Sequence, residues 1–127
     1  MKDKEHQNSI LYIEDNPANL RLVEQILENI PNVHMWAASE PHIGIELAKE
    51  HLPDLILLDI NLPGMDGYEV LKNLQNDKAC RDIAVIAISA NAMPKDILKG
   101  KEAGFDSYIT KPLNVKELLQ IVESKLK

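Results

Sequence analysis

Cysteine is nearly absent from the sequence, since Cys80 is the only one among 127 residues. A single thiol makes neither an internal disulfide nor a zinc site, so a reducing compartment is expected. Long apolar runs are missing too, because none approaches the ~18 residues that span a membrane. The first eight residues, MKDKEHQN, are polar or charged and lack the apolar core of a signal peptide. The sequence therefore predicts a cytoplasmic protein without a membrane-spanning segment.

Positive charge is also scarce. The 14 Lys and Arg residues are outnumbered by 20 Asp and Glu residues, which gives a formal net charge of −6. Non-specific binding to nucleic acid or to an anionic membrane needs a basic surface, so we expect neither partner. A chain of this length suits one domain. We place that domain at residues 9–127, after a flexible polar tail formed by residues 1–8.

Short apolar runs alternate with helical patterns along the whole domain. The runs predict five strands, at residues 10–13, 33–38, 55–59, 83–88 and 105–109. The patterns after them predict five helices, beginning near Pro17, Pro41, Gly67, Pro94 and Val115. Because parallel neighbours need crossover connections, the predicted fold class is α/β: a flavodoxin-like (βα)5 three-layer sandwich, with a parallel five-stranded sheet of order 2-1-3-4-5. The second strand is less apolar and suits an edge.

Each helix should bury one apolar stripe, and Asn16 and Asn114 are good N-caps for the first and last helices. The helix from Pro94 to Ala103 has few apolar residues and a weaker pattern. The spacing assigns to the buried stripes Leu20, Val23, Leu27 and Ile30 in the first helix, Ile43, Leu47, Ala48 and His51 in the second, Val70, Leu71 and Leu74 in the third, and Val115, Leu118, Leu119, Val122 and Leu126 in the last.

The stretch from Asp54 to Gly64 lies at the centre of this pattern. Four apolar residues separate Asp54 from Asp59, and Pro63-Gly64 follows, as expected for a short strand buried on both faces. Asp59 ends this strand, at the carboxyl edge where open α/β sheets bind ligands. An Asp that only caps the following turn would give the same local pattern. This stretch alone leaves both interpretations open.

Polar side chains follow three other strands at the same edge of the predicted sheet. Glu14 and Asp15 follow the first strand, and acids are common in a first helical turn. Ser89 and Lys111 follow the fourth and fifth strands, where a small turn residue and a solvated charge are both ordinary. Each residue alone is best explained in this plain way. Their joint placement beside Asp59 favours a functional site.

Three carboxylates within a few ångströms of one another repel. At ~4 Å and an effective dielectric near 20, each pair costs roughly 4 kcal/mol, so the cluster should hold protons or attract a cation. An all-oxygen site with room for water suits Mg²⁺, with Mn²⁺ as a substitute. Such a site suits the acceptance of a phosphoryl group. Asp59 would be the nucleophile, Ser89 would donate a hydrogen bond, and Lys111 would neutralise the transferred oxygens.

This set of residues resembles the receiver domain of two-component response regulators, from about residue 9 to the C-terminus. The resemblance is carried by Glu14-Asp15, Asp59, Ser89, Lys111-Pro112 and the loop at residues 62–67. It implies that the three acids bind the metal together with the backbone carbonyl of Asn61. It also implies a cis peptide bond before Pro112, and X-Pro bonds are where cis peptides occur. Tyr108 would act with Ser89 as an aromatic switch, although by itself it is typical of an ordinary half-buried strand residue.

The function implied by the resemblance is that of a phospho-acceptor in a His-Asp phosphorelay, not an enzyme. The donor would be a histidine kinase or a histidine phosphotransfer protein. The last helix reaches Lys127, so we expect the signal to pass by docking to another protein, through a face formed by the fourth helix, fifth strand and fifth helix. A monomer or weak dimer is expected. The starting methionine and polar tail favour a free-standing protein, and a receiver segment excised from a hybrid histidine kinase is the alternative.

Three other classes fit parts of the pattern. A flavodoxin-like redox protein shares the fold, but acids after the first strand would repel a flavin phosphate where a phosphate-binding loop is needed. A Mg²⁺-dependent aspartyl-phosphate phosphatase is the enzyme alternative, because Asp59 and Asn61 resemble its nucleophile motif, but the second Asp of that motif and a cap domain are missing. A pure scaffold is the third class, and the complete set of site residues argues against it.

Overall fold

The computed structural model describes residues 7–126, in which five strands alternate with five helices. No helix in this part of the chain is both long and apolar enough to cross a membrane. The elements are β1 (Asn8–Ile13), α1 (Pro17–Leu27), β2 (Val33–Ala38), α2 (Pro41–His51), β3 (Leu55–Asp59), α3 (Gly67–Gln75), β4 (Ala84–Ser89), α4 (Pro94–Ala103), β5 (Ser107–Thr110) and α5 (Val115–Lys125).

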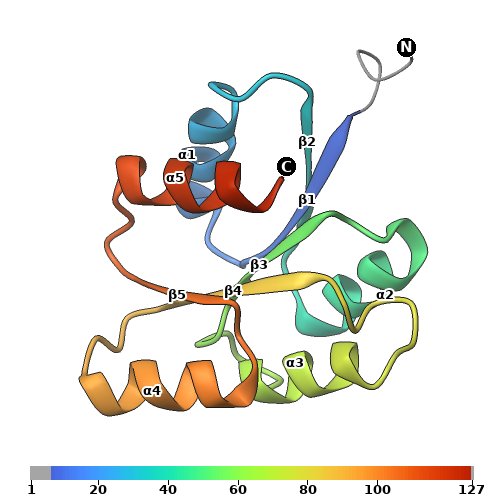
Figure 1. Ribbon diagram of the computed structural model, residues 1–127, viewed down its shortest axis with the longest axis vertical. Coiled ribbons are helices and arrows are strands. Elements are labelled where there is room, and N and C mark those ends of the chain that lie inside the picture. The colour runs from blue at the N-terminus through green and yellow to red at the C-terminus, as the bar shows by residue number, and fades with distance from the viewer. Residues whose placement is uncertain (1–6, 127) are drawn as a thin grey trace.

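The strands form one sheet whose order is β2-β1-β3-β4-β5, and all four neighbouring pairs are parallel. Helices α1 and α5 cover one face, and α2, α3 and α4 cover the other (Figure 1). The predicted fold class, the three layers and the strand order are therefore confirmed. Because all strands run the same way, their carboxyl ends meet along one edge.

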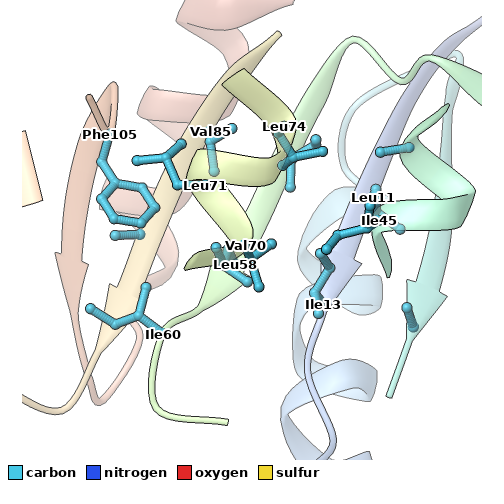
Figure 2. Close-up of a cluster of buried hydrophobic side chains, with 14 of the residues drawn as sticks. Leu11, Ile13, Ile45, Leu58, Ile60, Val70, Leu71, Leu74, Val85 and Phe105 are labelled. Atoms are coloured by element: carbon cyan, nitrogen blue, oxygen red, sulfur yellow. The ribbon is translucent and has the colours of Figure 1, made fainter. Parts of the chain in front are cut away.

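The central strand β3 is buried along its whole length. Its side chains alternate between two cores, as the two-residue period of a strand requires. Leu55 and Leu57 pack toward α1 and α5, whereas Ile56 and Leu58 pack in the core on the α2 and α3 side. Figure 2 shows Leu58 in that second core, near Val70 of α3. Asp59 therefore stands at the end of a strand enclosed by strands and helices on all sides.

Three helices begin at a residue whose side chain caps them. The Asn16 side chain accepts hydrogen bonds from the amides of Ala18 and Asn19, at 2.8 and 3.2 Å, and Pro17 is the first helical residue. Asp66 caps α3, and Asn114 caps α5 through the amide of Glu117 at 2.8 Å. Each cap satisfies backbone N–H groups that a helix leaves unpaired at its start.

The predicted buried stripe of α2 is wrong in part. Ile43 is 42% exposed and His51 is also exposed, whereas Gly44 and Ile45 face the sheet. The reason is a close approach, because a Cβ at Gly44 would stand 2.5 Å from Cδ1 of Ile13. Only glycine lets α2 come so near to β1, and this contact turns the neighbouring stripe outward. Ala48 is buried as predicted.

The other stripes are closer to the prediction. Val70, Leu71 and Leu74 are buried in α3. In α5, Leu118 and Val122 are buried, but the predicted burial of Val115 is wrong, since this first helical residue is 46% exposed. Element boundaries differ from the predicted ones by one or two residues. The fifth strand begins at Ser107 rather than at residue 105, and β1 begins at Asn8, inside the predicted tail. Residues 1–6 of that tail lie outside the described part of the chain.

Candidate functional site

Four of the predicted site residues meet at the carboxyl edge of the sheet. Asp59 ends β3 and is 4% exposed, and Ser89 ends β4 with no exposed surface. Glu14 follows β1 and is 1% exposed. Lys111 follows β5, and its backbone amide donates to the carbonyl of Ser89 at 2.8 Å. Parallel pairing of β1, β3, β4 and β5 therefore brings together residues that lie up to 97 positions apart in the sequence.

Lys111 is the positive charge between two buried acids. Its Nζ lies 2.9 Å from Oδ2 of Asp59 and 3.8 Å from Oε1 of Glu14. Burial by itself would lower the pKa of Lys111. The hydrogen bond to Asp59 and the negative charges of Asp59, Glu14 and Asp15 outweigh burial, so the pKa of Lys111 is raised. The ammonium group is therefore held in its charged form. The peptide bond between Lys111 and Pro112 is cis.

Glu14 is held by three donors. The Tyr12 hydroxyl donates to Oε1 at 3.0 Å, the Asn19 side-chain amide donates to Oε1 at 3.4 Å, and the Asn16 backbone amide donates to Oε2 at 3.1 Å. Burial and the nearby charge of Asp59 raise the pKa of Glu14, against the lowering effect of the Asn16 and Tyr12 hydrogen bonds. The site thus contains a carboxylate that is well oriented but poorly solvated.

Tyr12 and Asn19 were not among the predicted site residues. A signal for Tyr12 exists in the sequence, because residues two apart along a strand point to the same face and Tyr12 precedes Glu14 by two. Burial and the negative charges of Glu14 and Asp59 raise the pKa of the Tyr12 hydroxyl, so it stays a donor. No comparable local signal marks Asn19, whose contact depends on how α1 leaves β1.

Asp59 caps the turn after β3 and also contacts Lys111. Its Oδ1 accepts from the backbone amide of Asn61 at 2.9 Å, which is the expected cap of the turn after β3. Its Oδ2 meets the Lys111 ammonium at 2.9 Å. The turn contact fixes the orientation of the carboxylate, and the lysine balances its charge.

The turn then continues to Gly67, where a Cβ would stand 2.6 Å from Cα of Ile60, so only glycine fits.

Asp15 is placed differently from the other two acids, because it is exposed. Across residues 7–126 there is no group of three or more His, Cys, Asp or Glu side chains arranged to hold a metal ion. The donor chemistry nevertheless fits a hard cation, since Glu14 and Asp59 are buried oxygen donors and, among the described residues, Lys111 is the one cation paired with them. The predicted metal site of Glu14, Asp15, Asp59 and the Asn61 carbonyl therefore stays a prediction.

Ser89 makes contacts that lead away from Asp59. Its hydroxyl donates to Oδ1 of Asn61 at 3.2 Å and accepts from the backbone amide of Asn91 at 3.0 Å. The Tyr108 hydroxyl donates to the carbonyl of Asn91 at 3.1 Å. The two predicted switch residues are therefore both bonded to the backbone of Asn91. For Asn61 the sequence predicted a role of the backbone carbonyl alone, and the hydrogen bond between its side chain and Ser89 was not predicted.

The comparison with known proteins agrees with this geometry. A model of the response regulator receiver domain matches residues 10–123. The chain belongs to this family. The family match favours the receiver interpretation over a redox protein, a phosphatase or a scaffold. Receiver domains of two-component systems interact with kinases and with downstream targets, so this chain is a signalling module.

Known relatives of this receiver domain include regulators and parts of sensor kinases. The polar-differentiation response regulator DivK of Brucella ovis is 37% identical over 120 residues, which cover 93% of this chain and 95% of DivK. The receiver domain of the sensor histidine kinase PA1611 from Pseudomonas aeruginosa PAO1 is 28% identical, with a TM-score of 0.83 over 94% of this chain and 97% of the other, and its structure holds a magnesium ion in the active site cleft. The Mn²⁺-bound response regulator Rcp1 is 28% identical, with a TM-score of 0.76 over 92% and 90% of the two chains.

Proposed function

We propose that this receiver takes a phosphoryl group onto Asp59 and passes the signal to a protein partner. The observation that carries the proposal is the position of Asp59, which ends the fully buried β3 and meets the Lys111 ammonium at 2.9 Å. The Asn61 amide and the Lys111 ammonium each hold one oxygen of this carboxylate at the carboxyl edge of the sheet. The donor would be a histidine kinase or a histidine phosphotransfer protein.

The transfer is a displacement at phosphorus. A carboxylate oxygen of Asp59 forms a bond to phosphorus while the bond between phosphorus and the donor's imidazole nitrogen breaks, and that nitrogen takes up a proton. Lys111 neutralises the oxygens of the arriving group, and the Ser89 hydroxyl donates a hydrogen bond to one of them. The receiver would thus assist its own phosphorylation and dephosphorylation. Because the group that changes is its own Asp59, we propose a phospho-acceptor and not an enzyme.

A Mg²⁺ ion, with Mn²⁺ as a substitute, would complete the site. Glu14, Asp15, Asp59 and the Asn61 carbonyl are the oxygen groups that would hold it, and the ion would supply positive charge against the transferred oxygens. The magnesium found in the PA1611 receiver and the manganese found in Rcp1 support this assignment. Asp15, now exposed, would turn toward the ion.

The output would be a change in the face formed by α4, β5 and α5. A phosphoryl group adds roughly two negative charges, and it would draw the Ser89 hydroxyl toward Asp59. Tyr108 on the neighbouring strand would then move inward and reshape that face. Met93 and Leu98 are large, exposed apolar side chains on or next to α4, at 59% and 57% exposure, and they offer the partner a contact there.

The setting of this proposal is a cytoplasmic phosphorelay. We propose that the protein works as a monomer or weak dimer in the manner of a response regulator such as DivK, which the alignment covers over 95% of its length. A receiver segment of a hybrid histidine kinase is the alternative, and the likeness to the PA1611 receiver supports it.

Incubation with Mg²⁺ and acetyl phosphate, followed by intact mass, tests the proposal. The wild type should gain the mass of one phosphoryl group, and EDTA should prevent the gain. Asp59→Asn should abolish it. Asp54→Asn is a matched control, because Asp54 flanks the opposite end of β3, where its side chain accepts the Ser9 amide at 2.8 Å. Labelling of Asp59→Asn at the wild-type rate would show that Asp59 is not the acceptor.

A further inference from the structure

A continuous chain of hydrogen bonds joins Asp59 to Tyr108, and the side chain of Asn61 is its middle link. The Asn61 backbone amide donates to Oδ1 of Asp59 at 2.9 Å. Its side-chain Oδ1 accepts from the Ser89 hydroxyl at 3.2 Å and from the Ala90 backbone amide at 3.1 Å. One carboxamide oxygen therefore holds two consecutive residues of the loop after β4.

The chain continues from this loop to the aromatic ring. The Asn91 amide donates to the Ser89 hydroxyl at 3.0 Å, and the Asn91 carbonyl accepts from the Tyr108 hydroxyl at 3.1 Å. The position of the Ser89 hydroxyl and the position of the Tyr108 ring are thus linked through one stretch of backbone. Releasing Asn61 from the loop would loosen both.

The contact between Asn61 and Ser89 also competes with the proposed chemistry. Ser89 has one hydroxyl proton, and in this structure that proton is given to Asn61. A phosphoryl oxygen on Asp59 carries charge, and charged acceptors form hydrogen bonds roughly twice as strong as neutral ones. Ser89 therefore cannot bond the phosphoryl group until it leaves Asn61, and the charged oxygen is the stronger acceptor.

We propose that the Asn61 carboxamide is a positioning group that holds the unphosphorylated state, by occupying the Ser89 hydroxyl and the Ala90 amide as a stand-in for phosphoryl oxygens. Phosphorylation replaces this neutral acceptor with a charged one at the same donors. The loop then leaves Asn61, and the Asn91 carbonyl releases the Tyr108 hydroxyl. The inference rests on the proposed phosphorylation of Asp59 and adds to it the contact that resists the switch.

The test is carried out on the unphosphorylated protein. Amide exchange of Ala90 and Asn91 is measured in the wild type, in Asn61→Leu, which lacks the acceptor but has a similar shape, and in Asn61→Asp, which keeps an acceptor oxygen. We expect exchange at Ala90 to be about tenfold faster in Asn61→Leu, because a typical hydrogen bond has been lost, and near the wild-type rate in Asn61→Asp. Asn73→Leu is the control, since the Asn73 side chain also makes an exposed hydrogen bond, but within α3.

The NMR signals of Tyr108 give the second readout. In unphosphorylated Asn61→Leu they should move part of the way toward their positions in wild type bound to beryllofluoride, whereas the signals of Asn73→Leu should not move. Unchanged exchange at Ala90 overturns the proposal. Faster exchange with unmoved Tyr108 signals overturns it too, because Asn61 would then tether the loop without affecting the ring. Asn61→Ala replaces the leucine variant if the latter does not fold. Failure of the phosphorylation proposal would appear separately, as no mass gain at Asp59.

Discussion

The ring of Tyr108 lies directly on the backbone of Gly100. A Cβ at Gly100 would stand 2.6 Å from Cδ2 and 2.9 Å from Cε2 of that ring, closer than carbon atoms approach without displacement. Gly100 lies inside α4, where glycine costs roughly 1 kcal/mol relative to alanine. Glycine at this position lowers the stability of α4 but lets the Tyr108 ring pack against the helix. The position of the ring therefore depends on the position of α4.

Gly100→Ala should displace the Tyr108 ring from its position against α4. The added methyl group would push the ring away, and the 3.1 Å hydrogen bond to the Asn91 carbonyl would be lost. We expect the strain to outweigh the gain in helix propensity, so that the free energy of unfolding falls by about 1 kcal/mol. Urea denaturation and the NMR signals of Tyr108 measure these effects. Lys101→Ala, at an exposed position of the same helix, is the control; higher stability of Gly100→Ala with unmoved Tyr108 signals would contradict the prediction.

The raised pKa of Glu14 predicts a specific dependence of stability on pH. Because the folded protein holds this proton more tightly than the unfolded chain, Glu14 contributes stability below its ordinary pKa of 4.5, and that contribution is lost as the pH rises through the raised folded value. Glu14→Gln cannot titrate. In EDTA, its free energy of unfolding should therefore rise relative to wild type with increasing pH, by about 1.4 kcal/mol for every pH unit that separates the folded pKa of Glu14 from the unfolded one.

Urea denaturation from about pH 4 to about pH 8 measures this difference. Glu102→Gln, at an exposed position in α4, should follow the wild-type curve. A difference between Glu14→Gln and wild type that stays constant across the range would show that Glu14 does not titrate abnormally.

Asp15 should contribute to metal binding although it is exposed in this structure. A ligand present at 100 times its dissociation constant stabilises the folded state by about 2.7 kcal/mol. Mg²⁺ should therefore raise the melting temperature of the wild type, and Asp15→Asn should lose most of that rise. Asp82→Asn removes an exposed acid elsewhere and should keep it. Equal Mg²⁺ responses of the two variants would exclude Asp15 as a ligand.

The edge of the sheet was predictable from the sequence because its causes are local or topological. Apolar runs such as residues 55–58 define strands, and the alternation with helices makes the strands parallel. Parallel strands then place Glu14, Asp59, Ser89 and Lys111 at one edge whatever the details of packing. Side-chain contacts across that edge are different. The bond between Asn61 and Ser89 joins residues 28 positions apart, and it depends on how two loops meet.

The error in α2 has a physical cause of the same kind. Helix α2 carries two adjacent stripes with apolar residues, one through Ile43 and Leu47 and one through Ile45 and Ala48. A period of 3.6 residues describes both equally well. The choice is made by tertiary packing, because Gly44 allows the second stripe to approach Ile13 closely. Each stripe contains an isoleucine, so hydrophobicity alone does not separate them, and the stripe next to Gly44 is the one that packs on the sheet.

The last prediction concerns where the phosphoryl donor docks. Helix α1 begins at the Asn16 cap, two residues after Glu14, so its first turns border the site. Arg21 is exposed on this helix, where it can attract an acidic donor surface. Arg21→Glu should slow transfer from the cognate histidine donor by roughly tenfold, mainly through slower association. Labelling by acetyl phosphate should stay unchanged, because a small molecule needs no docking surface.

The matched control for this charge reversal is Arg81→Glu. Arg81 is the other arginine of the chain, and it is exposed just before β4 begins, at the opposite end of the strands from Asp59. Arg81→Glu changes the net charge by the same amount as Arg21→Glu but leaves the rim of the site intact. Stopped-flow or gel-based transfer assays at two salt concentrations separate the two variants, since a docking charge loses its effect as salt increases. Equal slowing of both reactions in Arg21→Glu would mean that the site itself was damaged, and equal slowing by both variants would mean that only net charge matters.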